Sequence, residues 1–434
     1  MIKDFFKRIN NEITDIENSI NINKYFYDDI NIWPMYRIGY FMFRKKEISN
    51  YNKISFFLKI KNKLSRALIY LINNISNDNL SDDIDCLYVG SNTHRTTIDG
   101  KFVNRYFNHL LNKNSRLIEY NNRLLKLERN TIDFNKIIIN NKKIDSLNFK
   151  IVDNLTKDLS KILDDNEILD KVTIFVKNVL MYYSYSEIFL KRLNIKKIFF
   201  LSYYSAPALG LCIAANKLKI QTTEVQHGPI GKFHLAYCFN YKKLVKNLST
   251  PNEIHIWHKS FKPILKNSFR KVNVTGNYYL NKYAKNINGH NPDKILITLQ
   301  PKDSDLSNLI INIIKKFYCE SKIVIRLHPR INISLDLKNK LNYVKKNYNV
   351  KISDPYMTPL HIDLKDTFVH ITGYSGTSIE ALSQNITTIL LDKKANHFFE
   401  NFINEEKMIF CDNLKENDVI KIIQKIKCSF LIKK

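Results

Sequence analysis

The feature that most constrains the fold is a regular alternation of short apolar runs and helical segments in the last third of the chain. Apolar runs of strand length occur near 294–299, 322–327, 349–353, 367–372, 387–391 and 408–411. Helical patterns near 304–319, 334–347, 377–384 and 415–427 lie between most of them. Strands connected through helices form parallel sheets, so residues 294–434 are predicted to fold as a doubly wound α/β domain.

A second domain of the same kind is expected before it. Residues 81–276 contain strand-like runs near 86–90, 116–120, 197–203, 222–226, 253–257 and 271–275, with helical patterns near 101–112, 154–166, 172–193 and 205–217. The polar stretch 277–293, with Gly289 and Pro292, is predicted to link the two domains. Residues 1–80 are aromatic-rich and helical in pattern. We therefore expect an α/β protein with two Rossmann-like domains facing a central cleft, preceded by a helical extension.

Composition limits the possible partners and the compartment. The chain has 434 residues, 44% of them apolar, and a formal charge of +27, so its surface attracts anions. Its 6 cysteines form no C-x-x-C pair, which favours reduced thiols in the cytoplasm. The N-terminus has no uninterrupted apolar segment of the signal-peptide kind, and no run of about 18 apolar residues predicts a membrane span.

Two motifs in the C-terminal half suggest a phosphate site. The run Lys322–Leu327 ends at His328-Pro329, with Arg326 and Arg330 on either side. The second motif is a strand followed by a turn of small residues, Ser375-Gly376-Thr377-Ser378, in which Thr377 and Glu380 have capping-box spacing. We expect these motifs to end adjacent strands, where free helix amides and the imidazole bind one anion. A structural histidine and an ordinary helix start are the alternatives for each motif taken alone.

The N-terminal half offers two candidates for a catalytic base. His227 ends a predicted strand in the segment Gln226-His227-Gly228, and Asp99 lies on a polar loop beside His94 and Arg95. A histidine tied to its own loop, or an Asp-Gly turn, would account for the same residues without catalysis.

In these motifs the chain resembles bacterial GT-B glycosyltransferases of capsule and lipopolysaccharide synthesis, especially those that use CMP-linked sialic acid or Kdo. The resemblance rests on His328-Pro329, on the Ser/Thr-rich turn with Glu380, and on the Gln226-His227-Gly228 strand end. It implies inverting, metal-independent sugar transfer, in which Arg326, His328, Pro329, Arg330 and the 375–380 turn bind the donor. Asp99 or His227 would be the base, and His94, Arg95, Gln226 and Gly228 would bind the acceptor. The acidic motif of some sialyltransferases is missing, since Asp82-Asp83 is followed by Ile84.

The resemblance also implies the partners. It predicts a nucleotide-sugar co-substrate with no resident cofactor and no metal, and a glycan or lipid-linked glycan as acceptor. It places the protein in the cytoplasm, at the inner face of the cytoplasmic membrane if the basic segment 56–75 rests on anionic lipid rather than on the next domain. The alternatives are a CDP-glycerol, UDP-hexose or GDP-hexose donor, a nucleotide-sugar epimerase, and a basic nucleic-acid-binding protein. The last is supported by charge alone, and we do not expect nucleic acid as a partner.

Overall fold

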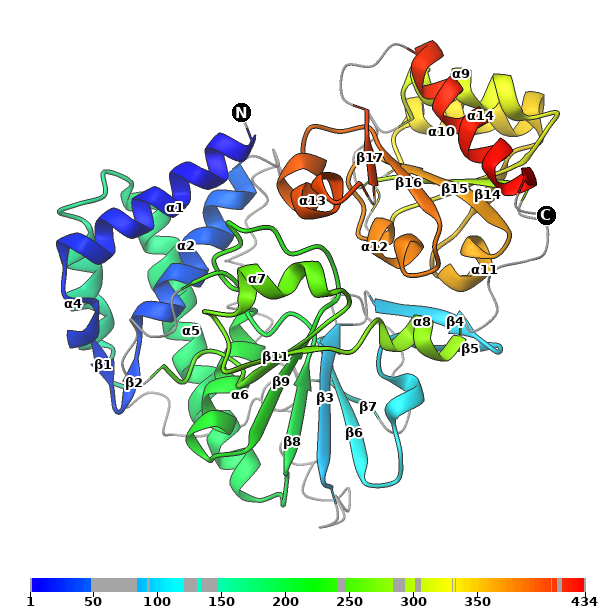
Figure 1. The fold of residues 1–434 in the computed structure, drawn as a ribbon. Helices are drawn as coiled ribbons and strands as arrows, with labels where there is room; N and C mark the ends of the chain where they lie inside the picture. The colour runs from blue at the N-terminus through cyan, green and yellow to red at the C-terminus, as the bar shows by residue number, and fades with distance from the viewer. Residues whose placement is uncertain are drawn as a thin grey trace.

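The protein is built on two parallel sheets with helices packed against them (Figure 1). The structure, a computed structural model, describes residues 2–47, 84–91, 94–120, 131–133, 147–239, 247–283, 293–300, 306–329, 331, 333–406, 408–411 and 416–432. Each sheet belongs to one Rossmann-like domain, and the helices α1 and α2 precede the first. The predicted α/β class and the GT-B arrangement of two domains are therefore confirmed.

The N-terminal sheet has 7 strands in the order β11-β10-β9-β8-β3-β6-β7, all paired in parallel. Apolar residues of the central strands are buried on both faces, which is why these strands are apolar runs. The strands are β3 (Cys86–Ser91), β6 (Ser115–Tyr120), β7 (Thr131–Asp133), β8 (Lys197–Phe200), β9 (Gln221–Val225), β10 (Glu253–Ile256) and β11 (Lys271–Val274).

Helices α4 (Lys150–Leu159), α5 (Asn166–Lys191) and α6 (Ala206–Lys217) pack beside this sheet. Helices α5 and α6 approach closely at Gly210. A Cβ atom there would lie 2.6 Å from the backbone nitrogen of Tyr183 and from the Cβ atom of Tyr182. Any larger residue at this position would push the two helices apart.

The N-terminal extension is helical, as predicted, in the part that is described. Helix α1 (Ile2–Ser19) buries the apolar face formed by Phe6, Ile9, Ile13 and Ile16. Helix α2 (Trp33–Glu47) packs against α5, and a small hairpin, β1 (Phe26–Tyr27) with β2 (Ile30–Asn31), lies between α1 and α2 in sequence. The basic segment 56–75 lies outside the described residues.

The C-terminal sheet has 6 strands in the order β14-β13-β12-β15-β16-β17, again all parallel. Its strands are β12 (Lys294–Thr298), β13 (Lys322–Arg326), β14 (Lys351–Ser353), β15 (Thr367–Thr372), β16 (Thr387–Leu390) and β17 (Met408–Phe410). The helices of this domain are α9 (Asn308–Phe317), α10 (Leu335–Tyr348), α11 (Leu360–Leu364), α12 (Thr377–Leu382), α13 (Ala395–Asn404) and α14 (Glu416–Ile432).

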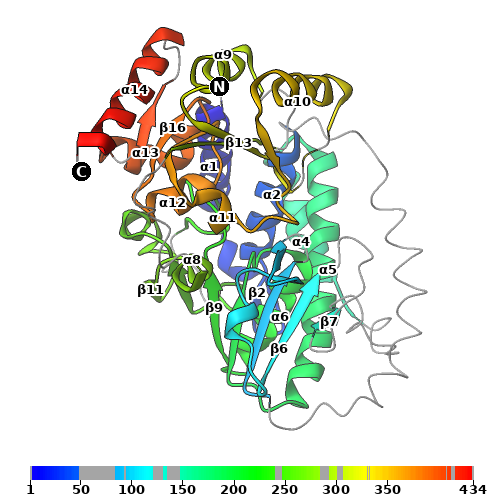
Figure 2. The same ribbon diagram turned by 90° about the vertical axis from the view of Figure 1, so that its right-hand side faces the viewer.

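The two domains pack directly on one another. Figures 1 and 2 show α8 (Tyr278–Tyr283), α11 and α12 between the two sheets. Helix α13 also reaches the N-terminal domain, because His397 stacks between Phe6 of α1 and Phe233, at ring separations of 4.6 and 5.7 Å. Buried residues of α12 and α13, including Ile379 and Phe399, belong to the same apolar core as the N-terminal domain.

Three expectations about local structure were wrong. The region 91–112 contains a hairpin, β4 (Arg95–Ile98) and β5 (Lys101–Asn104), where a loop and a helix were expected. Its turn is Asp99-Gly100, with φ of +49° and +75°, a pair that strongly favours a hairpin. The first part of the expected linker forms α8, with Asn277 and Tyr279 buried. The strands that lead to His328 and Ser375 are not adjacent, because β12 lies between them.

Candidate functional site

The site lies at the carboxyl ends of the strands, where the two sheets meet. In the N-terminal sheet, Val89 of β3 pairs with Phe200 of β8, and Phe200 pairs with Glu224 of β9. These three strands therefore end at the same edge. The chain segments that leave them carry His94, Ser202 and His227, so the topology brings these residues together.

The loop that follows β9 touches the turn that follows β15. A Cβ atom on Gly376 would lie 3.1 Å from Cδ of Pro229 and 3.6 Å from the Cα atom of Gly228. Glycine at 376 thus allows the backbones of the two domains to approach closely. The segments 226–229 and 375–378, both singled out in the sequence, meet across the domain interface.

Gln226 holds the first of these loops in place. Its side-chain nitrogen donates to the carbonyl of Gly228 at 2.8 Å, and its side-chain oxygen accepts from the backbone nitrogen of Trp257 at 2.8 Å. With Gln226 almost fully buried, these bonds fix the path of the loop rather than contact an acceptor. His227 is half-buried, and its backbone carbonyl accepts from the Tyr106 hydroxyl at 3.3 Å.

The turn at 375–380 does not form the expected capping box. The backbone nitrogen of Thr377 donates to the Ser375 hydroxyl at 3.3 Å, and Gly376, the residue before the helix, makes no side-chain cap. Helix α12 has only 6 residues, so its dipole adds little to anion binding. Ser375 and Thr377 are half-buried at the interface, whereas Ser378 is fully buried.

Glu380 faces the N-terminal domain instead of its own helix start. Its carboxylate accepts from the side chain of Asn277 at 3.0 Å, and only 3% of the residue is exposed. Burial raises the pKa of Glu380, and the positive charges of Arg105 and Arg326 partly offset that effect. Its role in donor binding remains a prediction.

Arg105 and Tyr106 were missed in the sequence, although both lie close to Glu380 of the other domain. The Arg105 guanidinium donates to the Tyr106 hydroxyl at 2.6 Å and lies over that ring, 4.7 Å from its centroid. Its Nε atom is buried with no hydrogen-bond partner among the described residues. Burial lowers the pKa of Arg105, but Tyr106 and Glu380 outweigh this, so the group stays cationic. An anion in the interface would satisfy it. The Asp99-Gly100 turn signal would have placed Arg105 directly after a strand.

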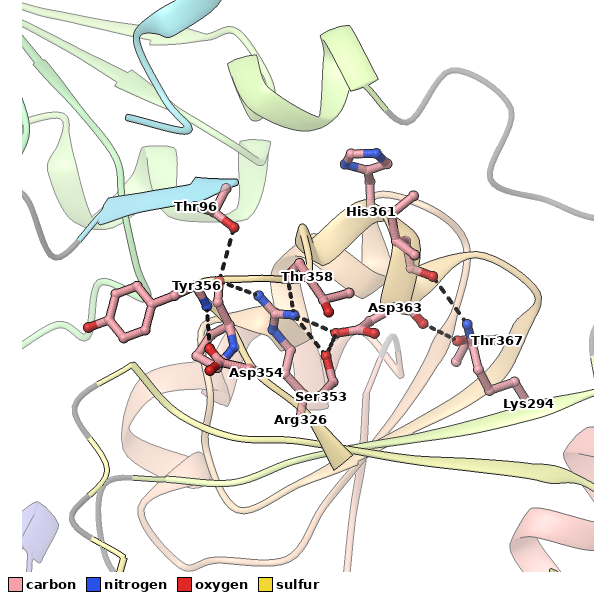
Figure 3. A network of polar contacts seen from close by, with 12 residues as sticks. Thr96, Lys294, Arg326, Ser353, Asp354, Tyr356, Thr358, His361, Asp363 and Thr367 are labelled. Atoms are coloured by element: carbon pink, nitrogen blue, oxygen red, sulfur yellow. Dashed lines mark hydrogen bonds and ion pairs between the residues drawn. The ribbon is translucent and has the colours of Figure 1, made fainter. Parts of the chain in front are cut away.

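Arg326, expected to bind phosphate, is instead enclosed in a network of its own domain (Figure 3). Its guanidinium forms a buried ion pair with Asp363 and donates to the carbonyl of Thr358 at 2.8 Å. Asp363 in turn accepts from the Ser353 hydroxyl at 2.6 Å. These contacts fix the loop 354–358 and do not support the expected contact of Arg326 with phosphate, which stays a prediction.

That loop receives the β4–β5 hairpin of the N-terminal domain. The Thr96 hydroxyl donates to the carbonyl of Pro355 at 3.0 Å. The backbone nitrogen and the hydroxyl of Thr97 donate to the carbonyl of Tyr356, at 2.8 and 3.0 Å. The Tyr356 hydroxyl then donates to the carbonyl of Pro329 at 2.8 Å, so the hairpin is connected to the His-Pro motif. His328 and Pro329 are half-buried at this strand end, and Arg330 lies outside the described residues.

The other residues near the hairpin have different environments. Arg95, expected to bind the acceptor, forms a buried ion pair with Glu119 at 2.7 Å, which does not support that role. His94 packs edge-on against Tyr106, and its ring centroid lies 5.6 Å from that of His227. Asp99 is exposed at the hairpin turn, as expected for an Asp-Gly pair without a catalytic role. Its assignment as a base is untested.

In the described part of the chain, neither a cavity, nor a group of metal ligands, nor a membrane-spanning helix helps to locate the site. An open cavity of about 510 Å³ is lined by Phe26, Tyr27, Asp28, Asn148, Lys150, Ile151 and Asn154. It lies away from both sets of strand ends and is bordered in sequence by residues outside the described ranges. Within those ranges, no three His, Cys, Asp or Glu side chains are grouped as a metal would require. Nor does any described helix have the length and apolarity needed to span a bilayer.

The chain was compared with known proteins at the level of sequence and of structure. No family model and no curated protein matches its sequence. Similar solved structures include a UDP-GlcNAc 2-epimerase from Neisseria meningitidis bound to UDP-GlcNAc, with 12% identity, coverage of 79% of this chain and 91% of that chain, and a TM-score of 0.45. The calicheamicin glycosyltransferase CalG4 shows 11% identity, 80% and 90% coverage and a TM-score of 0.44. A putative UDP-N-acetylglucosamine 2-epimerase from Listeria monocytogenes shows 11% identity, 80% and 88% coverage and a TM-score of 0.47. These structural neighbours are thus GT-B-like glycosyltransferases and UDP-GlcNAc 2-epimerases. Such low similarity assigns no activity, and the fold assignment above rests on the strand order of this chain.

Proposed function

We propose that this protein is a glycosyltransferase that moves a sugar from a nucleotide donor to a glycan acceptor. The donor binds mainly to the C-terminal domain and the acceptor to the N-terminal domain. The single observation that supports this most is the contact between the 226–229 loop and the 375–377 turn. It supports the proposal because the candidate donor and acceptor residues then lie on opposite sides of one interface at the carboxyl ends of two parallel sheets.

The charges at this interface suit a phosphate leaving group. Arg105 provides a cation whose buried Nε atom has no hydrogen-bond partner in the described part of the chain, and Ser375 and Thr377 carry hydroxyls on the 375–377 turn. Stabilisation of charge that develops on the leaving phosphate is usually the largest contribution to such a transfer. His328 follows β13, and the 375 turn follows β15, with β12 between these two strands. Two strand spacings separate their backbones by about 10 Å. A nucleoside diphosphate, or a nucleotide with its linked sugar, is long enough to span that separation.

Transfer also requires a base for the acceptor hydroxyl, and His227 fits this role better than Asp99. Its ring is 18% exposed at the strand end, whereas Asp99 is exposed at the turn of a hairpin. A partly buried imidazole at a strand end is well placed to accept a proton from an acceptor hydroxyl. His94 lies within reach of the same acceptor group.

For the donor we favour a CMP-linked acidic sugar, as the motif resemblance implies, at the inner face of the cytoplasmic membrane in capsule or lipopolysaccharide synthesis. A CDP-glycerol, UDP-hexose or GDP-hexose donor would occupy the same strand ends. Thermal unfolding with CMP, CDP, UDP and GDP separates these possibilities, because a ligand that binds only the folded state raises the melting temperature. A shift with UDP and none with CMP would rule out the favoured donor.

Two further measurements test the transferase itself. The variant Arg105→Met should lose the shift produced by the active nucleotide. The matched control Arg116→Met should keep it, because Arg116 lies at the opposite, amino-terminal end of β6 and bonds the carbonyls of Lys113 and Ser115. Product analysis with the donor alone and with donor plus acceptor then distinguishes transfer from epimerisation. A changed sugar without an acceptor would contradict the proposal.

A further inference from the structure

Ser202 has a strained backbone at a position where polar residues can act on a ligand. It lies two residues after the end of β8, precedes α6, and has a φ of +65°. A residue other than glycine with positive φ is uncommon and is held in place by its surroundings at a cost of about 1–3 kcal/mol. Ser202 is half-buried at the edge where β3, β8 and β9 end, so its hydroxyl lies at the candidate acceptor side.

Glu224 holds this strained turn through hydrogen bonds to its backbone. One carboxylate oxygen accepts from the backbone nitrogen of Ser202 at 3.0 Å, and the other accepts from that of Tyr203 at 3.1 Å. The Tyr237 hydroxyl donates to the first oxygen at 2.6 Å. Glu224 is fully buried, and burial raises its pKa to about 8 against the opposing effect of these hydrogen bonds. One buried acid therefore holds two consecutive backbone amides of this turn in place.

His227 connects this turn to the proposed chemistry. Its Nε2 atom lies 2.8 Å from the Ser202 hydroxyl, within hydrogen-bond distance. Its Nδ1 atom lies 3.8 Å from the nearer oxygen of Glu224. Because Nε2 faces Ser202, a hydroxyl of the acceptor reaches this ring nitrogen most directly through the serine.

A serine, a histidine and an acid in this order also suggest a nucleophilic serine. In such enzymes the amide that follows the serine binds the oxyanion of the intermediate. Here the amide of Tyr203 is already bonded to Glu224. The geometry therefore opposes acyl transfer through Ser202 and favours movement of a proton.

We propose that Ser202 passes the proton of the acceptor hydroxyl to His227, and that Glu224 is the positioning residue that holds Ser202 in its strained turn. This inference rests on the proposed transferase function. In the step, the acceptor oxygen bonds to the anomeric carbon while its proton moves to Oγ of Ser202. The serine proton moves to Nε2 of His227. The bond from the anomeric carbon to the nucleotide phosphate breaks, and its electron pair leaves with the phosphate. Glu224 takes no proton.

The variant Ser202→Gly separates strain from chemistry. Glycine adopts positive φ without strain, so the free energy of unfolding should stay the same or rise. Loss of the hydroxyl should lower kcat at least a hundredfold, within the usual range for a proton-transfer residue, while the thermal shift with the active nucleotide is kept. The matched control is Ser205→Ala in the same turn, which should retain the wild-type kcat. A Ser202→Gly variant with the wild-type kcat would overturn the relay and leave the transferase proposal intact.

Two readouts on the free protein do not depend on transfer. With ¹⁵N-labelled histidine, Ser202→Gly should shift the Nε2 resonance of His227, and Ser205→Ala should not. An unchanged resonance in Ser202→Gly would refute the Ser202–His227 bond even if no donor is found. A fluorophosphonate probe should leave the wild-type protein unlabelled at Ser202. Labelling that disappears in Ser202→Gly would instead identify Ser202 as a nucleophile and overturn the relay.

Discussion

The end of β13 and the ends of β8 and β9 each carry a buried ionisable residue, but the surroundings of the two residues differ. At the end of β13, Arg326 is paired with Asp363 and bonded to a carbonyl of its own domain. At the ends of β8 and β9, Glu224 holds a strained turn, and the half-buried side chain of His227 lies beside it. A buried ion pair with hydrogen-bonded partners stabilises a loop, whereas a residue with positive φ beside a partly exposed imidazole is a candidate for chemistry.

The largest expected effect comes from breaking the Arg326 network. Arg326→Met leaves Asp363 buried without its cation, so the free energy of unfolding measured in urea should fall by about 3–5 kcal/mol. The double variant Arg326→Met with Asp363→Leu should recover more than half of that loss. A stable Arg326→Met protein that no longer binds nucleotide would show that the comparison is wrong and that Arg326 belongs to the site.

Glu224 should give the N-terminal domain a distinctive pH dependence. Its pKa is raised from 4.5 to about 8, so between these values the folded state holds a proton that the unfolded state releases. The contribution of Glu224 to stability is therefore full below about pH 4.5 and is lost as the pH rises to about 8. The free energy of unfolding of Glu224→Gln should fall less steeply over this pH window than that of the wild type. The two should differ by a few kcal/mol at most. An identical slope in both proteins would contradict the burial of a neutral acid.

His370 of β15 provides the opposite slope in the C-terminal domain. It is fully buried, which lowers its pKa to about 3 from 6.5. As the pH falls, His370 takes up a proton in the unfolded state at a higher pH than in the folded state. Its contribution to the free energy of unfolding is therefore present above about pH 6.5 and is lost as the pH falls toward 3. Stability curves of His370→Asn and Glu224→Gln should therefore differ from the wild type in opposite directions.

His328 lies two residues beyond Arg326, but its substitution should weaken nucleotide binding or turnover and leave the stability unchanged. We expect His328→Ala to lower nucleotide affinity or turnover at least tenfold, or about 1.4 kcal/mol, with the free energy of unfolding unchanged. Titration of the active nucleotide and urea unfolding of the same preparation measure both quantities. If affinity and turnover match the wild type, His328 is removed from the site.

The smallest expected effect concerns the hairpin contact between the domains. Thr97→Val removes the hydroxyl bond to the carbonyl of Tyr356 and leaves the backbone bond in place. The loss in stability should be about 1 kcal/mol or less. A loss of several kcal/mol would mean that this contact, rather than the α13 interface, holds the domains together.

Much of the fold follows from periodicity, whereas much of the site does not. Buried strands such as β12 and β15 are apolar runs between helices, and their ends can be located in a sequence. The strand order cannot, which is why β12 between the two C-terminal motifs was not foreseen. The partners of Arg326 were also hidden, because Asp363 lies 37 residues away on a helix of 5 residues. Ser202 was hidden as well, because it falls inside the predicted strand run 197–203, whereas β8 ends at Phe200.

The most direct test of the account is a crystal structure of the protein with the nucleotide that raises its melting temperature most. We predict that the phosphate lies between the 375–377 turn and Arg105, within hydrogen-bond distance of a Thr377 or Ser375 hydroxyl and of the guanidinium. A phosphate bound elsewhere, for instance in the cavity lined by Phe26 and Lys150, would contradict the account.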